Sequence, residues 1–328
     1  MDSPIFVDKK TFSETFNSFY SRGIPFFFLI DFNVKRFFIK PLSALAGESL
    51  LYNFNGFTNC NEKKVHKDIE IIPVFIDYPL YSSKFHRVLE HLKAGDSYLL
   101  NLTMPVEISL NKNFDEIYLS INSKYKVKFY DEFLFFSPET FVKIEGGRIS
   151  TYPMKGTISG LEDGAVNKLL SDEKELSEHL TVVDLLRNDL SMIAENVRVN
   201  KFRFVSEIKT HEGSIFQTSS EIVGDLKKGF FSDPAGNFLK LLPAGSVTGA
   251  PKRRTVEIIR SLEGYDRGFY TGVSGTYDGQ LLDSCVNIRF IEQNRGKFFY
   301  KSGGGVTVYS DCLKEYVELS KKIYAPVY

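Results

Sequence analysis

Residues 25–39 read PFFFLIDFNVKRFFI, two apolar runs rich in phenylalanine on either side of a short polar turn. This pattern predicts two aromatic β-strands joined as a hairpin. Residues 129–150 contain two more strand-like runs. Another strand, turn and strand are expected within residues 270–300, with Asp278-Gly279 as the clearest turn. The chain is therefore expected to be rich in aromatic strands.

Helical spacing appears between these strands. In residues 81–92, Phe85, Val88 and Leu92 recur at helical intervals, before a strand at residues 97–103. Three further helical segments are expected at residues 165–186, 254–262 and 311–323. Helices distributed among strands, without strict alternation, favour an α+β layered architecture over a doubly wound parallel sheet.

The composition is that of an ordinary globular protein. The chain has 328 residues, of which 43% are hydrophobic and 14% aromatic, enough for a sizeable core. Its 41 basic and 41 acidic residues give a net charge of zero, so no overall field attracts nucleic acid. The cysteines, Cys60, Cys285 and Cys312, lack CxxC spacing and are expected to fill the core in a reducing cytoplasm. Without a secretory leader or an apolar run of membrane length, we expect no membrane partner.

The sequence PMKGT at residues 153–157 places Lys155 on a stiff turn, where an amine could act chemically. A lysine in a turn is more often simply exposed. As a nucleophile it would have to be neutral, which burial or a nearby cation would favour. Glu139 lies sixteen residues upstream, with a hairpin expected between the two. If other acids crowd it, its raised pKa would suit a general acid, although it could also be a turn residue after Pro138.

Two pairs of carboxylates have helical spacing. Glu175 and Glu178 share one helix face, and so do Glu315 and Glu318, with Lys322 continuing the second stripe. Either pair alone is usually a solvated helix face. Together, oxygen ligands from two helices would suit Mg²⁺, which accepts a few protein carboxylates and an anionic substrate.

Glycine-rich segments complete the candidate site. The block PAGSVTGAPK at residues 243–252 precedes a helix and could cradle an anion with its backbone amides. The run GGGV at 303–306 follows a strand and would permit either a close ligand approach or a tight turn. Arg289 is a lone charge in an apolar, strand-like stretch, which favours pairing with a carboxylate of substrate or protein.

In this order, the motifs resemble the chorismate-utilising enzymes, the family of anthranilate, aminodeoxychorismate, isochorismate and salicylate synthases. The anchors are SPETF (137–141), PMKGT (153–157), EHLTVVDLLRNDL (178–190), PAGSVTGAPKRRTVEIIRSLE (243–263), RGFYTGVSGTY (267–277), IRF (288–290), GGGV (303–306) and EYVELSKK (315–322). The resemblance implies two packed antiparallel β-sheets flanked by helices, in one domain spanning residues 1–328. Residues 1–75 would complete the sheets, and residues 76–328 would form the catalytic core.

The resemblance also implies roles for individual residues. Mg²⁺ would bridge Glu178 and Glu318 to a substrate carboxylate, with Glu175 and Glu315 helping through water. The residues expected to bind chorismate are Ser246, Tyr270, Arg289, Gly304 and Lys322.

Within the family, a PxxGT turn that contains a lysine resembles the sequence of aminodeoxychorismate synthase component I. The product of that enzyme leads to 4-aminobenzoate and folate. Leu99 stands where isochorismate and salicylate synthases carry a lysine base. The implied mechanism has Lys155 attack C2 of chorismate while Glu139 protonates the departing C4 hydroxyl, before ammonia adds at C4. No Gly-x-Cys-x-Gly elbow occurs in the chain, so a separate glutamine amidotransferase is expected to supply ammonia.

Two departures from the family pattern matter. The N-terminal part is shorter than is usual, and we expect no tryptophan feedback. Where many relatives carry a histidine, the sequence reads SIFQTS (214–219), so His179 and His211 are interpreted as structural. Two alternatives remain open, anthranilate synthase component I and a non-catalytic chorismate-binding subunit.

Overall fold

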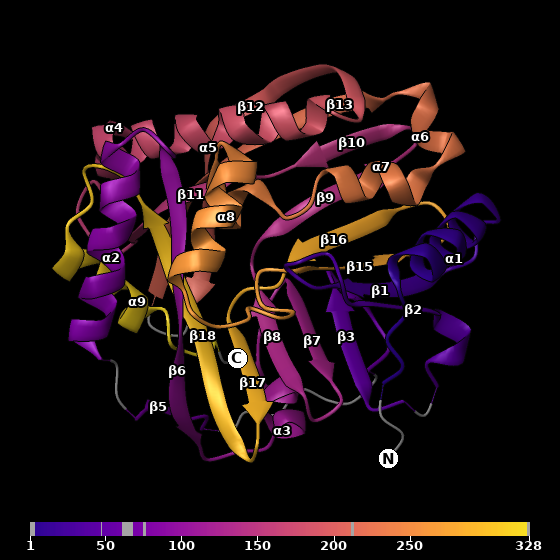
Figure 1. The fold of residues 1–328 in the computed structure, drawn as a ribbon, viewed down its shortest axis with the longest axis horizontal. Helices are drawn as coiled ribbons and strands as arrows, with labels where there is room; N and C mark the ends of the chain where they lie inside the picture. Colours follow the sequence, from indigo (N-terminus) through magenta and orange to yellow (C-terminus); the bar gives the residue numbers. More distant parts are fainter. Residues whose placement is uncertain (1–3, 47, 61–67, 75–76, 211–212, 327–328) are drawn as a thin grey trace.

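The fold is an α+β sandwich of two large antiparallel sheets flanked by helices (Figure 1). The computed structural model describes residues 4–46, 48–60, 68–74, 77–210 and 213–326. Every strand pair within the two sheets is antiparallel, as the resemblance implied.

The first sheet has the order β11-β13-β10-β9-β16-β15-β1-β2, and β12 pairs with β13. Its strands are β1 (Phe26–Ile30), β2 (Phe37–Pro41), β9 (Thr140–Glu145), β10 (Arg148–Thr151), β11 (Met154–Ser159), β12 (Ala194–Thr210), β13 (Gly213–Leu226), β15 (Val273–Tyr277) and β16 (Leu282–Val286).

The second sheet has the order β14-β6-β18-β17-β8-β7-β3-β4, and β5 pairs with β6. Its strands are β3 (Leu50–Phe54), β4 (Phe57–Thr58), β5 (Ile71–Pro73), β6 (Leu99–Leu110), β7 (Tyr125–Phe129), β8 (Phe133–Ser137), β14 (Gly249–Ala250), β17 (Phe290–Asn294) and β18 (Lys297–Val306). Strands from residues 1–75 thus pair in both sheets, while the division of the domain at residue 75 stays a prediction.

Helices cover the outer faces of both sheets. The helices are α1 (Lys9–Ser21), α2 (Tyr78–Lys93), α3 (Phe114–Ser120), α4 (Ala165–Ser171), α5 (Glu173–Ser191), α6 (Lys228–Ser232), α7 (Pro234–Lys240), α8 (Lys252–Leu262) and α9 (Cys312–Lys321), with short 3₁₀ turns η1 (Leu42–Ala44) and η2 (Gly245–Val247). Helices α1, α5 and α7 contribute to one core with the first sheet, whereas α2, α3, α8 and α9 pack on the second (Figure 1).

The expected hairpin at residues 25–39 is confirmed as β1 and β2, which pair from Phe26↔Pro41 to Ile30↔Phe37. Strand β1 is buried on both faces, which explains its unbroken apolar sequence. Phe26 and Phe28 face α1 and α7, while Phe27 and Leu29 face the second sheet.

An aromatic layer joins the two sheets at one end. Phe27 and Phe38 of the first sheet meet Tyr52, Phe54 and Phe129 of the second, with ring centres between 5.1 and 6.2 Å apart. These contacts involve β1 and β2 at one edge of the first sheet, and β3 and β7 near one edge of the second sheet. The opposite ends, with β11 in one sheet and β18 in the other, lie outside this layer.

Two local expectations were wrong, and one alternative is excluded. Residues 165–186 do not form one helix, because extended Asp172 ends α4 and caps α5 by accepting a hydrogen bond from the Glu175 amide at 2.9 Å. Of the two alternatives for the run GGGV, the tight turn is excluded, because residues 303–305 lie inside β18, paired with β6. Arg289 precedes β17 with a φ of 55°, so it marks a bend and is not a strand residue.

The helices that the structure describes include none that is both long and apolar enough to span a membrane. The cytoplasmic location stays a prediction of the sequence.

The aromatic layer yields a stability prediction. Phe27 is fully buried, and we expect Phe27→Ala to lower the free energy of unfolding by about 3–5 kcal/mol, through lost transfer energy and a residual cavity. Phe231→Ala is the control, because this side chain is 55% exposed and its loss should cost less than about 1 kcal/mol. Denaturant unfolding of both variants measures the difference, and equal costs would contradict the inter-sheet role of Phe27.

Candidate active site

Lys155 lies on a β-bulge near the start of β11. The β11–β13 register shifts between Lys155 and Thr157, and Gly156 between them has a φ of +74°. A bulge redirects the side chains beside it. The Lys155 amine forms an ion pair with Glu178 of α5, 3.6 Å from its Oε2. The Thr218 hydroxyl on β13 donates a hydrogen bond to the Lys155 carbonyl and secures the bulge.

The carboxylates of α5 lie beside this bulge, and those of α9 lie beside β18 of the second sheet. A methyl group in place of a hydrogen on Gly156 would lie 3.2 Å from Oε2 of Glu175, so α5 packs directly against the bulge. On α9, Glu315 is buried and accepts a hydrogen bond from Ser310 at 2.9 Å. Glu318 forms an ion pair with Lys322 at 2.7 Å.

Two adjacent glycines of β18 lie beside the charged groups just described. A methyl group on Gly304 would lie within 3.8 Å of Lys322, Glu315 and Glu318, whereas one on Gly305 would lie 3.9 Å from the Lys155 amine. Adjacent residues of one strand therefore lie beside the charged groups of α9 and beside the Lys155 amine of β11. A side chain at either glycine would intrude among those groups, which is a physical reason for glycine here.

The donor atoms in this region fit a hard divalent cation. Glu175, Glu178, Glu315 and Glu318 offer only carboxylate oxygens, the ligands that Mg²⁺ prefers. In the structure, Lys155 balances Glu178 and Lys322 balances Glu318. Within the described part of the chain, no three acidic, histidine or cysteine side chains are already gathered as a metal site. Glu178 and Glu318 would hold the ion, and substrate oxygens would complete its coordination.

Glu139 immediately precedes β9, close to both Lys155 and Arg289. Its carboxylate accepts a hydrogen bond from the Ser246 hydroxyl on η2. Burial raises the pKa of Glu139 above its ordinary value, and Ser246, Lys155 and Arg289 oppose that shift only in part. The site thus contains a carboxyl group that keeps its proton to higher pH than an exposed glutamate, as general acid catalysis requires.

Tyr270 and Arg289 form a second, cationic side of the site. Tyr270 is buried, its ring centre 6.0 Å from that of Phe290, and burial raises the pKa of its phenol. Burial tends to lower the pKa of Arg289, but the phenols of Tyr300, Tyr324 and Tyr270 outweigh it and raise the pKa overall. Arg289 forms no ion pair with any side chain that the structure describes.

The glycine-rich block at residues 243–252 makes several contacts within the protein, and its expected anion binding stays a prediction. Gly249 pairs with Leu100 in β14, and Lys252 forms an ion pair with Asp189 of α5 at 2.8 Å. In this block, Ser246 donates a hydrogen bond to Glu139, and the Lys252 ion pair links α8 to α5. Sheet pairing takes up the backbone of Gly249 and Ala250.

Sequence reasoning missed Arg267, which holds the wall of the site together. Its buried guanidinium binds both Glu263 oxygens, at 2.8 and 2.6 Å, and donates to the carbonyls of Val247 and Asn101 at 2.9 and 2.7 Å. One side chain therefore links α8, η2, β6 and the corner before Tyr270. The four-residue spacing from Glu263 to Arg267 was the available signal.

His179 adjoins Glu178 but is fully buried, with Nε2 2.6 Å from the Ser220 hydroxyl. Burial, Arg203 and Lys155 lower its pKa to about 4, so it is neutral near pH 7, in keeping with a structural role. His211 lies outside the described residues. Leu99 is buried against Gly305, so an apolar group stands at this position. Among the cysteines, only Cys285 is fully buried; Cys60 and Cys312 are partly exposed, so the core-filling prediction holds for one of the three.

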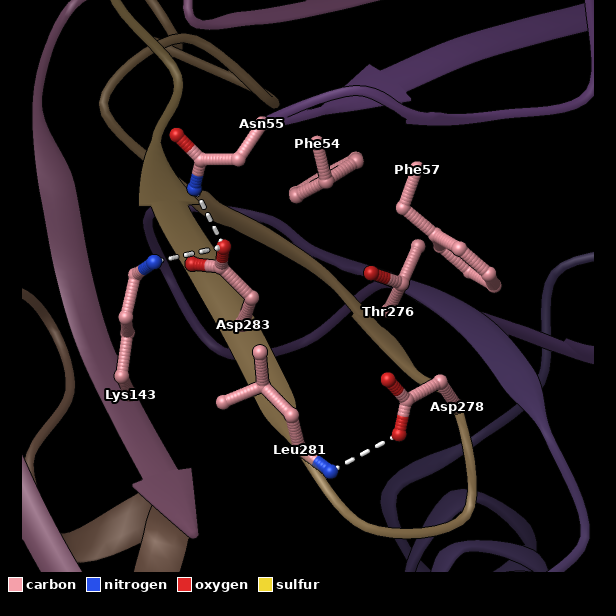
Figure 2. A pocket seen from close by; sticks show the side chains of 8 residues that line it. All are labelled: Phe54, Asn55, Phe57, Lys143, Thr276, Asp278, Leu281 and Asp283. Atoms are coloured by element: carbon pink, nitrogen blue, oxygen red, sulfur yellow. Dashed lines mark hydrogen bonds and ion pairs between the residues drawn. The ribbon is translucent and has the colours of Figure 1, made fainter.

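A separate cavity of about 130 Å³ lies near the β3–β4 turn, away from these groups. Figure 2 shows the residues that line it, which are Phe54, Asn55, Phe57, Lys143, Thr276, Asp278, Leu281 and Asp283. Asp283 accepts hydrogen bonds from Asn55 at 2.5 Å and from Tyr125 at 2.8 Å, and it pairs with Lys143 at 3.2 Å. Its charge is satisfied within the protein, and none of the predicted site residues lines the cavity.

Comparisons with known proteins agree with the geometry. The family described as chorismate binding enzyme matches residues 39–328. A protein of Haemophilus influenzae named an uncharacterized PabA-like protein is 44% identical, over 96% of each chain. Anthranilate synthase component 1 of Archaeoglobus fulgidus is 34% identical over 73% of this chain and 60% of its own length. Aminodeoxychorismate synthase component 1 of Bacillus subtilis is 32% identical over 75% of this chain and 54% of its own length.

Solved structures share the fold. The menaquinone-specific isochorismate synthase MenF of Escherichia coli aligns with a TM-score of 0.74 and 15% identity, over 98% of this chain and 83% of its own. Anthranilate synthase component I of Streptococcus pneumoniae aligns with a TM-score of 0.66 and 27% identity, over 80% and 60%. With the family match extending over residues 39–328, the chain belongs to the chorismate-binding enzymes of the anthranilate and aminodeoxychorismate synthase component I type.

Proposed function

We propose that this protein is an aminodeoxychorismate synthase component I, which converts chorismate and ammonia to 4-amino-4-deoxychorismate. The observation that carries the proposal is the position of Lys155, whose amine is 3.6 Å from Glu178 and adjacent to the glycines of β18. A lysine placed so close to the carboxylates expected to bind the metal can reach a substrate anchored there.

The first step would be nucleophilic. Lys155 pairs with Glu178 in the structure, so it must lose a proton before it attacks C2 of chorismate. Both ring double bonds would shift by one position as the C4 oxygen leaves. Glu139, whose pKa burial raises, would protonate that oxygen so that it departs as water. Ammonia would then bond to C4, both double bonds would shift back, and the lysine amine would be expelled from C2.

The remaining predicted residues would bind and orient the substrate. Arg289 and Tyr270 would bind one carboxylate of chorismate, because Arg289 is cationic and has no acidic partner among the described residues. Gly304 and Lys322 would contact the substrate from β18 and α9, and Ser246 would lie beside the ring. Mg²⁺ on Glu178 and Glu318, with Glu175 and Glu315 near, would anchor the other carboxylate and neutralise its charge.

Ammonia would come from a separate glutamine amidotransferase. The proposed partner follows from the chemistry, because the groups gathered in the site bind and activate chorismate and include no cysteine nucleophile for glutamine. Ammonium salts should therefore substitute for the partner in vitro. We place the reaction in 4-aminobenzoate and folate synthesis in the cytoplasm.

Anthranilate synthase component I is the second candidate, supported by the 34% identity to the Archaeoglobus fulgidus enzyme of that name. It would release pyruvate and aminate C2. Product identification by mass spectrometry, with chorismate, ammonium and Mg²⁺, distinguishes the two. A protein that binds chorismate without turnover would instead fit the third candidate, a non-catalytic chorismate-binding subunit.

Replacement of Lys155 tests the covalent step. We expect Lys155→Ala to slow amination by at least about 10³-fold, because the nucleophile is lost while substrate binding remains. Lys168→Ala is the matched control, since this lysine of α4 is 59% exposed and pairs with Glu162. Steady-state rates and mass analysis of a trapped adduct on Lys155 provide the measurements. Wild-type turnover by Lys155→Ala would rule out the covalent role.

Glu139→Gln should lower the rate of amination and raise the stability of the fold at neutral pH. The rate should fall by about 10²–10⁴-fold, because the general acid is removed. Glu139 binds its proton more tightly when folded, so the free energy of unfolding falls as pH rises from its unfolded pKa to its raised folded pKa. Glu139→Gln should therefore raise the melting temperature at neutral pH and abolish this pH dependence. Exposed Glu145→Gln is the control, and an unchanged rate in Glu139→Gln would contradict the assignment.

The metal assignment is tested by binding as well as by rate. Glu178→Gln and Glu318→Gln should each weaken Mg²⁺ binding at least about tenfold, since even outer-shell changes at metal sites cost that much. Calorimetric titration of Mg²⁺ in the presence of chorismate measures this directly. Glu173→Gln, an exposed position on the same α5, should bind Mg²⁺ as the wild type does. Equal affinity in all variants would place the ion elsewhere.

A further inference from the structure

Arg289 is a largely buried cation surrounded by phenols. Its Nε atom is buried and has no hydrogen-bond partner among the described residues. Tyr270, Tyr300 and Tyr324 are the groups that raise its pKa. An unpaired buried charge is costly unless a ligand completes it. The arrangement therefore favours a carboxylate that arrives with the substrate.

Tyr324 is the member of this group that the sequence motifs did not indicate. It follows α9, and the carbon of the Arg289 guanidinium lies 5.3 Å from the centre of its ring. Tyr270 and Tyr300 are buried, whereas Tyr324 is 46% exposed. Tyr324 is therefore the solvent-exposed member of the three phenols around Arg289.

The segment that carries Tyr324 is fixed to the second sheet. The Tyr300 hydroxyl on β18 donates to the Tyr324 carbonyl at 3.1 Å, and the Asn122 amide donates to the Pro326 carbonyl at 2.8 Å. The backbone that carries the ring is thus held at Tyr324 and again two residues later. The Tyr324 ring lies against the Arg289 guanidinium and its side chain also hydrogen-bonds to Arg289, whereas Nε has no partner among the described residues and could donate to a carboxylate.

We propose that Tyr324 is a positioning residue for substrate binding, which acts by holding the Arg289 guanidinium so that its edge meets a carboxylate of chorismate. The inference rests on the proposed binding role of Arg289, but not on which product forms. It adds the segment after α9 to the groups that set affinity for the substrate.

The test measures chorismate binding by calorimetry, with Mg²⁺ and without ammonium, in three variants of Tyr324. Tyr324→Leu should raise the dissociation constant about three- to tenfold, as expected for a partly buried cation–π contact. Tyr324→Phe and Tyr324→Trp retain an aromatic face but lose the hydroxyl that hydrogen-bonds to Arg289, so they should bind more tightly than Tyr324→Leu and less tightly than wild type. In turnover assays with ammonium, Tyr324→Leu should raise KM for chorismate and leave kcat nearly unchanged.

Tyr309→Leu is the control, because that tyrosine is 89% exposed and lies in the loop after β18. Melting temperatures of all variants identify any general loss of structure, including in Tyr324→Leu. The inference is overturned if Tyr324→Leu binds like wild type, if Phe is as weak as Leu, or if wild type does not bind chorismate. Binding by wild type with anthranilate as product would contradict the proposed function alone.

Discussion

The aromatic contact between the two sheets fixes the geometry on which the site depends. Phe27 and Phe38 pack against Tyr52, Phe54 and Phe129, so the sheets are joined at the β1–β2 end. Aromatic burial of this kind is insensitive to local charge and holds one end of the sandwich rigid. At the other end, polar groups can gather between β11, β18 and the two glutamate-bearing helices without disturbing the core.

Charge balance is the second constraint. The Lys155 amine pairs with Glu178 at the β11 bulge, and the Lys322 amine pairs with Glu318 beside β18. In the proposed function, a divalent cation held by these carboxylates would neutralise the charge of a substrate carboxylate. The same reasoning explains the opposite side of the site, where Arg289 has a positive charge and no acidic partner among the described residues. In the proposed function, the two sides would bind the two carboxylates of chorismate.

The residues that do not touch substrate are as consequential as those proposed to do so. Arg267 uses its guanidinium to link Glu263, Val247 and Asn101, so it fixes the loop that places Ser246 on Glu139. The raised pKa of Glu139 is a stability cost at neutral pH that the rest of the fold must offset. Such a cost is common where a group is held ready for proton transfer.

The sequence alone determined the fold class, the aromatic hairpin and the helices α2, α8 and α9, because period and composition are local properties. The sequence also predicted the residues of the candidate site, and their roles stay a prediction. It did not determine that Asp172 breaks a helix, that the GGGV run lies within a strand, or that Lys252 pairs with Asp189. These outcomes depend on which distant segment supplies a partner, and tertiary packing alone decides that. The proximity of Tyr324 to Arg289 has the same origin, since strands β17 and β18 and helix α9 separate them in sequence.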